Sequence, residues 1–273
     1  MFSLRAWLRR LLSWTAKTEP SVRVRRGRRG GCWFSRGRGP RLRRSGDPYR
    51  QSASWPYERL EPIALLAGVD NWIGGAAGAW NVGTNWSNGV PTSLSVVTIT
   101  GNVTVTSSTS TTIAGLSVGT GATLVINSSS FLQVSTTGAG TVTDDGTIQI
   151  GDSSTSGELS LSGTNAIQPD SGDTGSIVFA PTSGNNNDTA DELFYGSGLT
   201  IGQAMTVTAA AGQIVGSGNL TNEGLIQATS SGATFNVSLG TAGTNMDSII
   251  ASGGATVNVT GLGTNQLALE AET

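Results

Sequence analysis

The chain has 273 residues, of which 39 are glycine and only 6% are aromatic, so it holds few large side chains for a thick globular core. It has one cysteine and no histidine, which excludes an intramolecular disulfide and Ser-His-Asp or Cys-His catalysis and removes the commonest zinc ligand. The net charge of −2 hides a sharp division: residues 1–59 hold all 16 basic residues against three acidic ones, a net charge of +13, whereas residues 60–273 hold 15 acidic residues and no basic one.

Residues 1–59 are the first expected segment, a basic and largely disordered leader. Its beginning predicts a short basic amphipathic helix, because four apolar side chains recur there at helical spacing: Leu4, Trp7, Leu8 and Leu11. Residues 21–50 are rich in glycine and arginine, are interrupted by proline and have no hydrophobic period, so this stretch should be unfolded when alone. A block this basic is attracted to nucleic acid or anionic lipid. Alternatively, it is upstream sequence read through from a misplaced start and has no function.

Residues 60–70 are a second segment, of apolar character. Residues 60–67 read LEPIALLA. They resemble the LEPR-XLL motif, found near the N-terminus of large envelope-associated or secreted proteins of planctomycetes and some proteobacteria, with Ile63 where that motif has arginine. The resemblance implies a targeting role for Leu60, Glu61, Pro62, Leu65 and Leu66. Residues 63–69 also read as a shortened signal core or, alternatively, as a buried first strand.

Residues 71–91, NWIGGAAGAWNVGTNWSNGVP, are a third segment that holds the last three tryptophans of the chain, Trp72, Trp80 and Trp86. The spacing is similar to a bacterial pattern, W-x-G-G-x-x-G-x-W followed by N-W-S-x-G-x-P, that introduces the passenger regions of autotransporter-like and other repeat-rich surface proteins. Bulky rings on glycine-rich turns can cover the end of a thin β-stack, so we expect a cap. The alternative is a contact site where the rings stack on sugars.

Residues 92–273 predict an all-β domain with a period of two. Val, Ile and Leu alternate with Thr, Ser and Asn, and turn residues separate the alternating runs. The stretch GTVTDDGTIQ at residues 140–149 is matched by a second template, GNLTNEGLIQ, at residues 218–227, and the tripeptide GAT also opens several stretches. The offsets between these stretches fit a repeat unit of about 18–22 residues. We therefore predict a right-handed parallel β-solenoid of about nine coils, interrupted by an irregular insertion near residues 167–192. An antiparallel β-sandwich is the alternative fold.

The adjacent carboxylates Asp144 and Asp145 are the best candidates for acid and base catalysis. β-Helical glycosidases can hydrolyse polysaccharides with carboxylates alone. However, neighbours on a strand face opposite sides, and Asn222 and Glu223 stand at the same place in the second template, so the structural interpretation is that both pairs are turn residues. The chemistry of a β-helical lyase usually needs an arginine or lysine, and residues 60–273 contain neither. We therefore predict no enzymatic activity and name no firm catalytic residue.

Five carboxylates near the expected insertion could supply oxygen ligands to Ca²⁺. They are Asp170, Asp173, Asp188, Asp191 and Glu192. No EF-hand or Gly-Gly-x-Gly-x-Asp repeat accompanies them, so solvated loop acids are the structural alternative. We expect no other cofactor.

These observations predict a non-enzymatic exported protein, adhesin-like or a scaffold of the cell envelope, located in the envelope or outside the cell. Its expected partners are glycans or envelope components, and a bare solenoid end could pair with another copy. No apolar run reaches the roughly 18–20 residues needed to cross a bilayer as a helix. A carbohydrate-active β-helix and nucleic-acid binding by the leader are the alternative functions.

Overall fold

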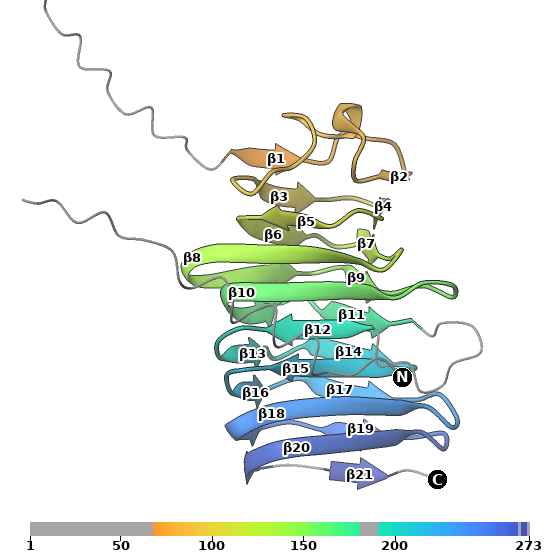
Figure 1. Ribbon diagram of the computed structural model, residues 1–273, viewed down its shortest axis with the longest axis vertical. Helices are drawn as coiled ribbons and strands as arrows, with labels where there is room; N and C mark the ends of the chain where they lie inside the picture. The colour runs from red at the N-terminus through yellow and green to blue at the C-terminus, as the bar shows by residue number, and fades with distance from the viewer. Residues whose placement is uncertain (1–67, 181–190, 267–268, 272–273) are drawn as a thin grey trace, which may run out of the picture. The chain divides into compact units, whose positions relative to one another are not determined.

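Alternating apolar residues and glycine-rich turns give the described residues a structure built from strands, from three to 15 residues long. The computed structural model describes residues 68–180, 191–266 and 269–271, so the leader and the targeting residues Leu60, Glu61, Pro62, Leu65 and Leu66 lie outside the described residues. Within them, all regular elements are strands except a 3-10 helix, η1 (Gly83–Asn85). The strands stack in register as two parallel sheets, which confirms the predicted parallel β-solenoid (Figure 1).

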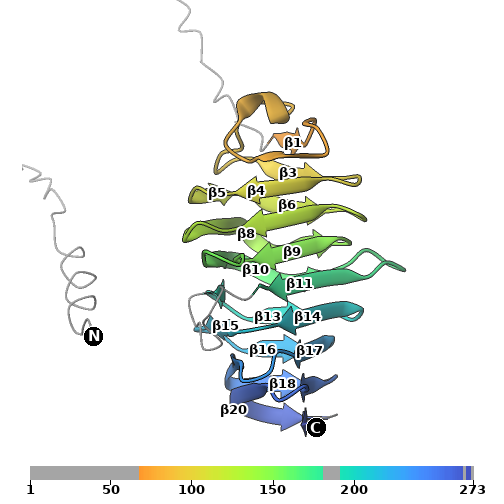
Figure 2. The same cartoon turned by 90° about the vertical axis from the view of Figure 1, so that its right-hand side faces the viewer.

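One sheet has nine strands and receives one strand from each turn of the solenoid, which we call a rung. In spatial order, which is also chain order, these strands are β2 (Ala77–Ala79), β4 (Thr104–Ser107), β7 (Thr123–Ile126), β9 (Thr147–Ile150), β11 (Gly175–Phe179), β14 (Met205–Ala209), β17 (Leu225–Ala228), β19 (Ile249–Ala251) and β21 (Leu269–Ala271). Nine strands make eight complete turns from the first strand to the last. Figure 2 shows these rungs stacked along one axis.

The second sheet has twelve strands. Its strands are β1 (Val69–Asn71), β3 (Val96–Ile99), β5 (Thr111–Ile113), β6 (Gly115–Val118), β8 (Ser130–Asp144), β10 (Gly157–Gln168), β12 (Glu192–Tyr195), β13 (Leu199–Ile201), β15 (Gly212–Gly216), β16 (Leu220–Asn222), β18 (Thr234–Asn245) and β20 (Thr256–Asn265). There are twelve because three rungs contribute two strands each to this sheet: β5 with β6, β12 with β13, and β15 with β16. The beginning of β10 pairs with β12 and its end pairs with β13, so this sheet supplies two faces of each such rung.

The length of a rung varies more than the repeats predict. A short turn leads from Thr104 to its register partner Thr123, whereas a much longer one leads from Ser176 to its partner Thr206. The short turns agree with the repeat unit expected from the sequence. The longer ones carry extra residues in their loops, which leave the pairing of the strands intact.

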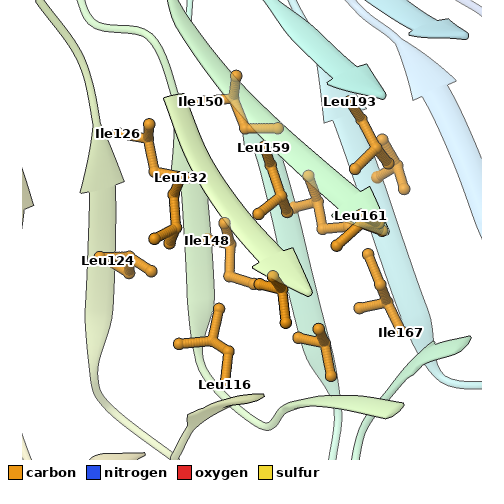
Figure 3. Close-up of a cluster of buried hydrophobic side chains, with 14 of the residues drawn as sticks. Leu116, Leu124, Ile126, Leu132, Ile148, Ile150, Leu159, Leu161, Ile167 and Leu193 are labelled. Atoms are coloured by element: carbon orange, nitrogen blue, oxygen red, sulfur yellow. The ribbon is translucent and has the colours of Figure 1, made fainter. Parts of the chain in front are cut away.

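The interior is a narrow column of aliphatic side chains from all three faces. In most strands alternate residues point inward and are almost fully buried, as the period of two predicts, whereas the end strands β2 and β21 have no buried residue. Figure 3 shows one part of this column, in which the labelled side chains are Leu116, Leu124, Ile126, Leu132, Ile148, Ile150, Leu159, Leu161, Ile167 and Leu193. Full burial stabilises each such side chain by about 1.5–3 kcal/mol relative to exposure. In the last rungs Val257 and Val259 pack against the core but are only partly buried.

The predicted irregular insertion near residues 167–192 is wrong in part. Strand β11 lies within it, and Ile177 and Phe179 of that strand point into the core, in register with β9 and β14. Pro169 and Pro181 flank a short alternating run, and the run pairs because its apolar residues have the same inward parity as the neighbouring rungs. Residues 181–190 lie outside the described residues.

The described part of the chain contains no helix with the length and apolar character that a membrane span requires.

Candidate functional site

The three tryptophans of residues 71–91 lie together at the first rung. Trp72, Trp80 and Trp86 are 7%, 1% and 2% exposed. The ring of Trp86 meets those of Trp72 and Trp80 edge-on, with centroids 5.1 Å and 4.8 Å apart. Trp86 Nε1 donates to the carbonyl oxygen of Trp80 at 2.7 Å. The rings therefore fill the interior of the first rung and leave little surface on which a sugar could stack.

Glycine makes room for these rings. A Cβ atom on Gly74 would lie 2.6 Å from the ring of Trp72, and one on Gly78 would lie 2.9 Å from Asn85 Nδ2. Asn85 in turn donates to the carbonyl oxygen of Ala79 at 3.0 Å. Glycine therefore occurs in this segment at positions where the backbone lies directly against the ring of Trp72.

Asp144 and Asp145 lie on opposite sides of the wall of the solenoid. Asp144, the last residue of β8, points inward and is fully buried, whereas Asp145 is partly exposed on the outside. Burial raises the pKa of the Asp144 carboxyl to about 7, and the backbone N–H groups of Gly146 and Ser176 only partly oppose this effect. A substrate on the outer surface could touch Asp145 but could not reach both carboxyl groups.

The second template forms the same turn. Gly146 N donates to Asp144 Oδ1 at 3.2 Å, and Gly224 N donates to Asn222 Oδ1 at 3.3 Å. Both side chains are fully buried and end a strand just before a glycine-containing turn. This geometry agrees with the interpretation of the two pairs as turn residues.

A buried asparagine ladder follows from this turn, and sequence reasoning missed it. Asn222 Nδ2 donates to Asn245 Oδ1, and Asn245 Nδ2 donates to Asn265 Oδ1, each at 2.8 Å. The three residues are direct register partners on consecutive rungs. The signal was present in the sequence, because the dipeptide Thr-Asn ends the corresponding strand of all three rungs.

The predicted Ca²⁺ ligands do not converge in the described residues. Asp170 and Asp173 lie in the loop between β10 and β11, where Asp173 N donates to the carbonyl oxygen of Asp170 at 3.1 Å. Asp191 is fully buried and its Oδ1 accepts a hydrogen bond from Gly157 N at 2.9 Å. Glu192 lies on the outer face and accepts from Gln213, and Asp188 lies outside the described residues. No group of three metal-ligating side chains occurs among the described residues.

A polar groove lies on the outside of the nine-stranded sheet, close to Asp145. It has a volume of about 430 Å³, and hydroxyl side chains of four successive strands line it: Thr123, Thr147, Ser176 and Thr206. Asp145, Gly146 and Gly175 also line it. Of the residues singled out in the sequence, this groove involves Asp145 alone. It depends on the register of strands that loops of unequal length connect, so no local pattern indicates it.

The last rungs form a second, apolar hollow. Its volume is about 460 Å³, and its lining includes Ile249, Val257, Val259 and Leu269. This is the surface at which the predicted pairing with another copy would take place, and that pairing stays a prediction.

Comparisons with known proteins add no identity to this geometry. No protein-family model, no curated protein and no solved structure matches the chain.

Proposed function

We propose that this chain is a non-enzymatic, exported surface protein, adhesin-like or a scaffold of the cell envelope, that acts through the outside of its β-solenoid. The proposal depends on the regular polar surface of the solenoid. Polar side chains of successive rungs lie in direct register there, as in the column Thr123, Thr147, Ser176 and Thr206. Repeated weak contacts along such a surface add up through multivalency, and they need no deep pocket.

Charge and composition support an extracellular setting. The described rungs have no basic side chain and no cysteine, and hydroxyl and amide groups dominate their outer faces. The basic leader and the LEPR-XLL-like segment that precede them fit an address that is read during export. Glycans and envelope components are the partners that such a hydroxylated surface suits.

The test is the location and the mature N-terminus of the protein in the cells that produce it. Fractions are digested with elastase, because trypsin has no site after Arg59, and the terminal peptide is identified by mass spectrometry. We expect an N-terminus near Gly68 in the envelope or the medium. An intact leader on a cytoplasmic protein would overturn the proposal and favour binding of nucleic acid by the leader, with the salt dependence of phosphate contacts.

The alternative is a glycoside hydrolase that uses Asp144 and Asp145. Such enzymes need two carboxyl groups that flank one glycosidic bond, and here one of the two is inside the wall. Release of reducing sugar from a panel of polysaccharides measures this activity. Activity that Asp145→Asn abolishes, with the fold unchanged, would favour the hydrolase.

A further inference from the structure

The polar groove on the nine-stranded sheet is built from a column of hydroxyl groups. Thr123 pairs with Thr147, Thr147 with Ser176, and Ser176 with Thr206, and all four line the groove. Neighbouring strands of a sheet are about 4.8 Å apart. The hydroxyl groups of the groove therefore repeat at that spacing along the axis of the rod.

Backbone glycines fix the shape of the groove. A Cβ atom on Gly146 would lie 2.5 Å from the carbonyl oxygen of Ala122, and one on Gly175 would overlap the carbonyl oxygen of Asp144. Neither position can carry a side chain without moving the backbone of the neighbouring rung. The groove is thus a preformed part of the wall, and a ligand would not have to organise it.

The charge of the groove restricts what it can bind. Asp145 stands at its rim, where Oδ1 accepts a hydrogen bond from Asp170 N at 2.6 Å, and no basic residue occurs anywhere after Arg59. An anionic polymer would meet a carboxylate with no cation to balance it. An uncharged polyol can instead donate to that carboxylate and exchange hydrogen bonds with the threonine hydroxyls.

We propose that this groove binds an uncharged, extended polysaccharide that lies along the rod axis and crosses strands β7, β9, β11 and β14. The hydroxyl groups of the polysaccharide bind along the column of threonine and serine side chains, and one hydroxyl group of the polysaccharide donates a hydrogen bond to Asp145. The site rests on the proposed function, because it gives the multivalent surface a ligand class: neutral glycans, in preference to uronic-acid or sulfated polymers.

The experiment is affinity electrophoresis of the full chain in gels that contain one soluble polysaccharide each. The neutral probes are hydroxyethylcellulose, galactomannan and dextran, and polygalacturonate is the anionic probe. We expect at least one neutral probe to retard the protein. Replacing two hydroxyl groups of the groove, as in Thr147→Val/Thr206→Val, should weaken that binding about tenfold or more, since each lost hydrogen bond costs about 1 kcal/mol.

A matched control separates the groove from threonine ladders in general. Thr200 and Thr221 are also register partners on the outside of the solenoid, but on the twelve-stranded sheet. Thr200→Val/Thr221→Val should bind as the unchanged protein does. Valine keeps the shape and strand preference of threonine, so both variants should fold. Asp145→Asn is a third variant, which keeps the acceptor for Asp170 N and should lower affinity without a change in the unfolding temperature.

Two outcomes would overturn the inference: no retardation by any neutral probe, or equal weakening of that binding by the two threonine pairs. Retardation by polygalacturonate counts against the inference only where Thr147→Val/Thr206→Val weakens it, because the basic residues 1–59 also attract an anionic polymer. These outcomes are independent of location. If the protein is found in the envelope but binds none of the neutral probes, the proposed function stands and the glycan site is wrong. If it is cytoplasmic but binds them through the groove, the glycan site stands and the proposed function is wrong.

Discussion

The carboxyl group of Asp144 is fully buried inside a largely apolar rung, where desolvation disfavours its ionised form. Its Oδ2 atom is buried and has no hydrogen-bond partner in the described structure. Two backbone N–H groups face the carboxyl group, and Asp145 adds a like charge nearby. The folded state therefore favours the protonated acid.

The pH dependence of stability follows from this burial. Folding raises the pKa of Asp144 from 3.8 to about 7. Well below pH 4 the group is protonated in both states. Between about pH 4 and 7 the unfolded chain loses the proton while the folded chain keeps it, so the free energy of unfolding falls as pH rises, by up to about 4 kcal/mol, and then levels off.

Asp144→Asn tests that origin, because asparagine occupies the equivalent position, Asn222, in the second template. The variant should lose most of the fall in unfolding free energy between pH 4 and 7, measured by urea denaturation at a series of pH values. Asp145→Asn, on the outside, is the matched control and should keep the fall. The same pH dependence in Asp144→Asn and in the unchanged protein would rule out this carboxyl group as its source.

Gly216 is a second residue whose role is steric. The ring of Tyr195 on the preceding rung covers it, and Tyr195 Oη reaches on to donate to the carbonyl oxygen of Ser238 at 2.7 Å. A Cβ atom on Gly216 would overlap both that ring and the carbonyl oxygen of Tyr195. The bare backbone is what lets one tyrosine span two rungs.

Gly216→Ala should therefore lower the free energy of unfolding by about 2 kcal/mol or more, the usual cost of overpacking a core. Gly196→Ala is the control, since a Cβ atom there would meet its nearest neighbour, the carbonyl oxygen of Leu161, at an ordinary 3.6 Å. Thermal and urea unfolding of the two variants gives the comparison. Equal stability of the two variants would show that the rung relaxes around the added methyl group.

At the scale of the strand, the asparagine ladder ties the last rungs together. Asn245 occupies its centre: its Oδ1 accepts from Asn222, and its Nδ2 donates to Asn265 Oδ1 and, at 2.7 Å, to the carbonyl oxygen of Asp247. Because the ladder is buried at Asn222 and Asn245, water cannot replace these bonds.

Asn245→Ala should cost about 2–4 kcal/mol of unfolding free energy, since it leaves buried partners without their hydrogen bonds. Asn258→Ala removes an exposed asparagine pair, in which Asn258 Nδ2 donates to Asn236 Oδ1 at 3.0 Å, and should cost less than about 0.5 kcal/mol. Urea denaturation measures both variants. A similar cost at the two positions would mean that the buried ladder adds nothing beyond an outer one.

Strands were the part of this molecule that local sequence could predict. The alternation around Val97 and Ile99, for example, specifies both the strand and its inward face, because one side must be buried. The segment at Ile177 and Phe179 has the same alternation, but nearby prolines and a run of asparagines made it look irregular. Pairing with the rungs on either side, which is not local, decided its structure.

The candidate site was less predictable than the strands. Asp144 and Asp145 stood out as residue types, and their opposite orientation follows from the period of two. The groove beside Asp145 does not, because it brings Thr123, Ser176 and Thr206 together across loops of unequal length. A sequence shows that threonines are frequent, but only the register shows that they form one column.

For the whole solenoid, stability should be distributed rung by rung. Each rung pairs only with the rungs before and after it, so the described rungs behave as a one-dimensional stack. A defect near the last rungs can then unfold its neighbourhood while the first rungs stay folded. Single-rung variants such as Asn245→Ala should broaden the thermal transition as well as shift it.

The placement of the tryptophans makes this behaviour visible. The last bond that trypsin can cleave is the one that follows Arg59. Cleavage there removes residues 1–59 with their four tryptophans and leaves a chain whose only indoles are Trp72, Trp80 and Trp86. All three lie at the first rung. Their ultraviolet emission is thus a built-in reporter at one end of the stack, against which the circular dichroism of all the strands can be timed to show from which end the protein melts.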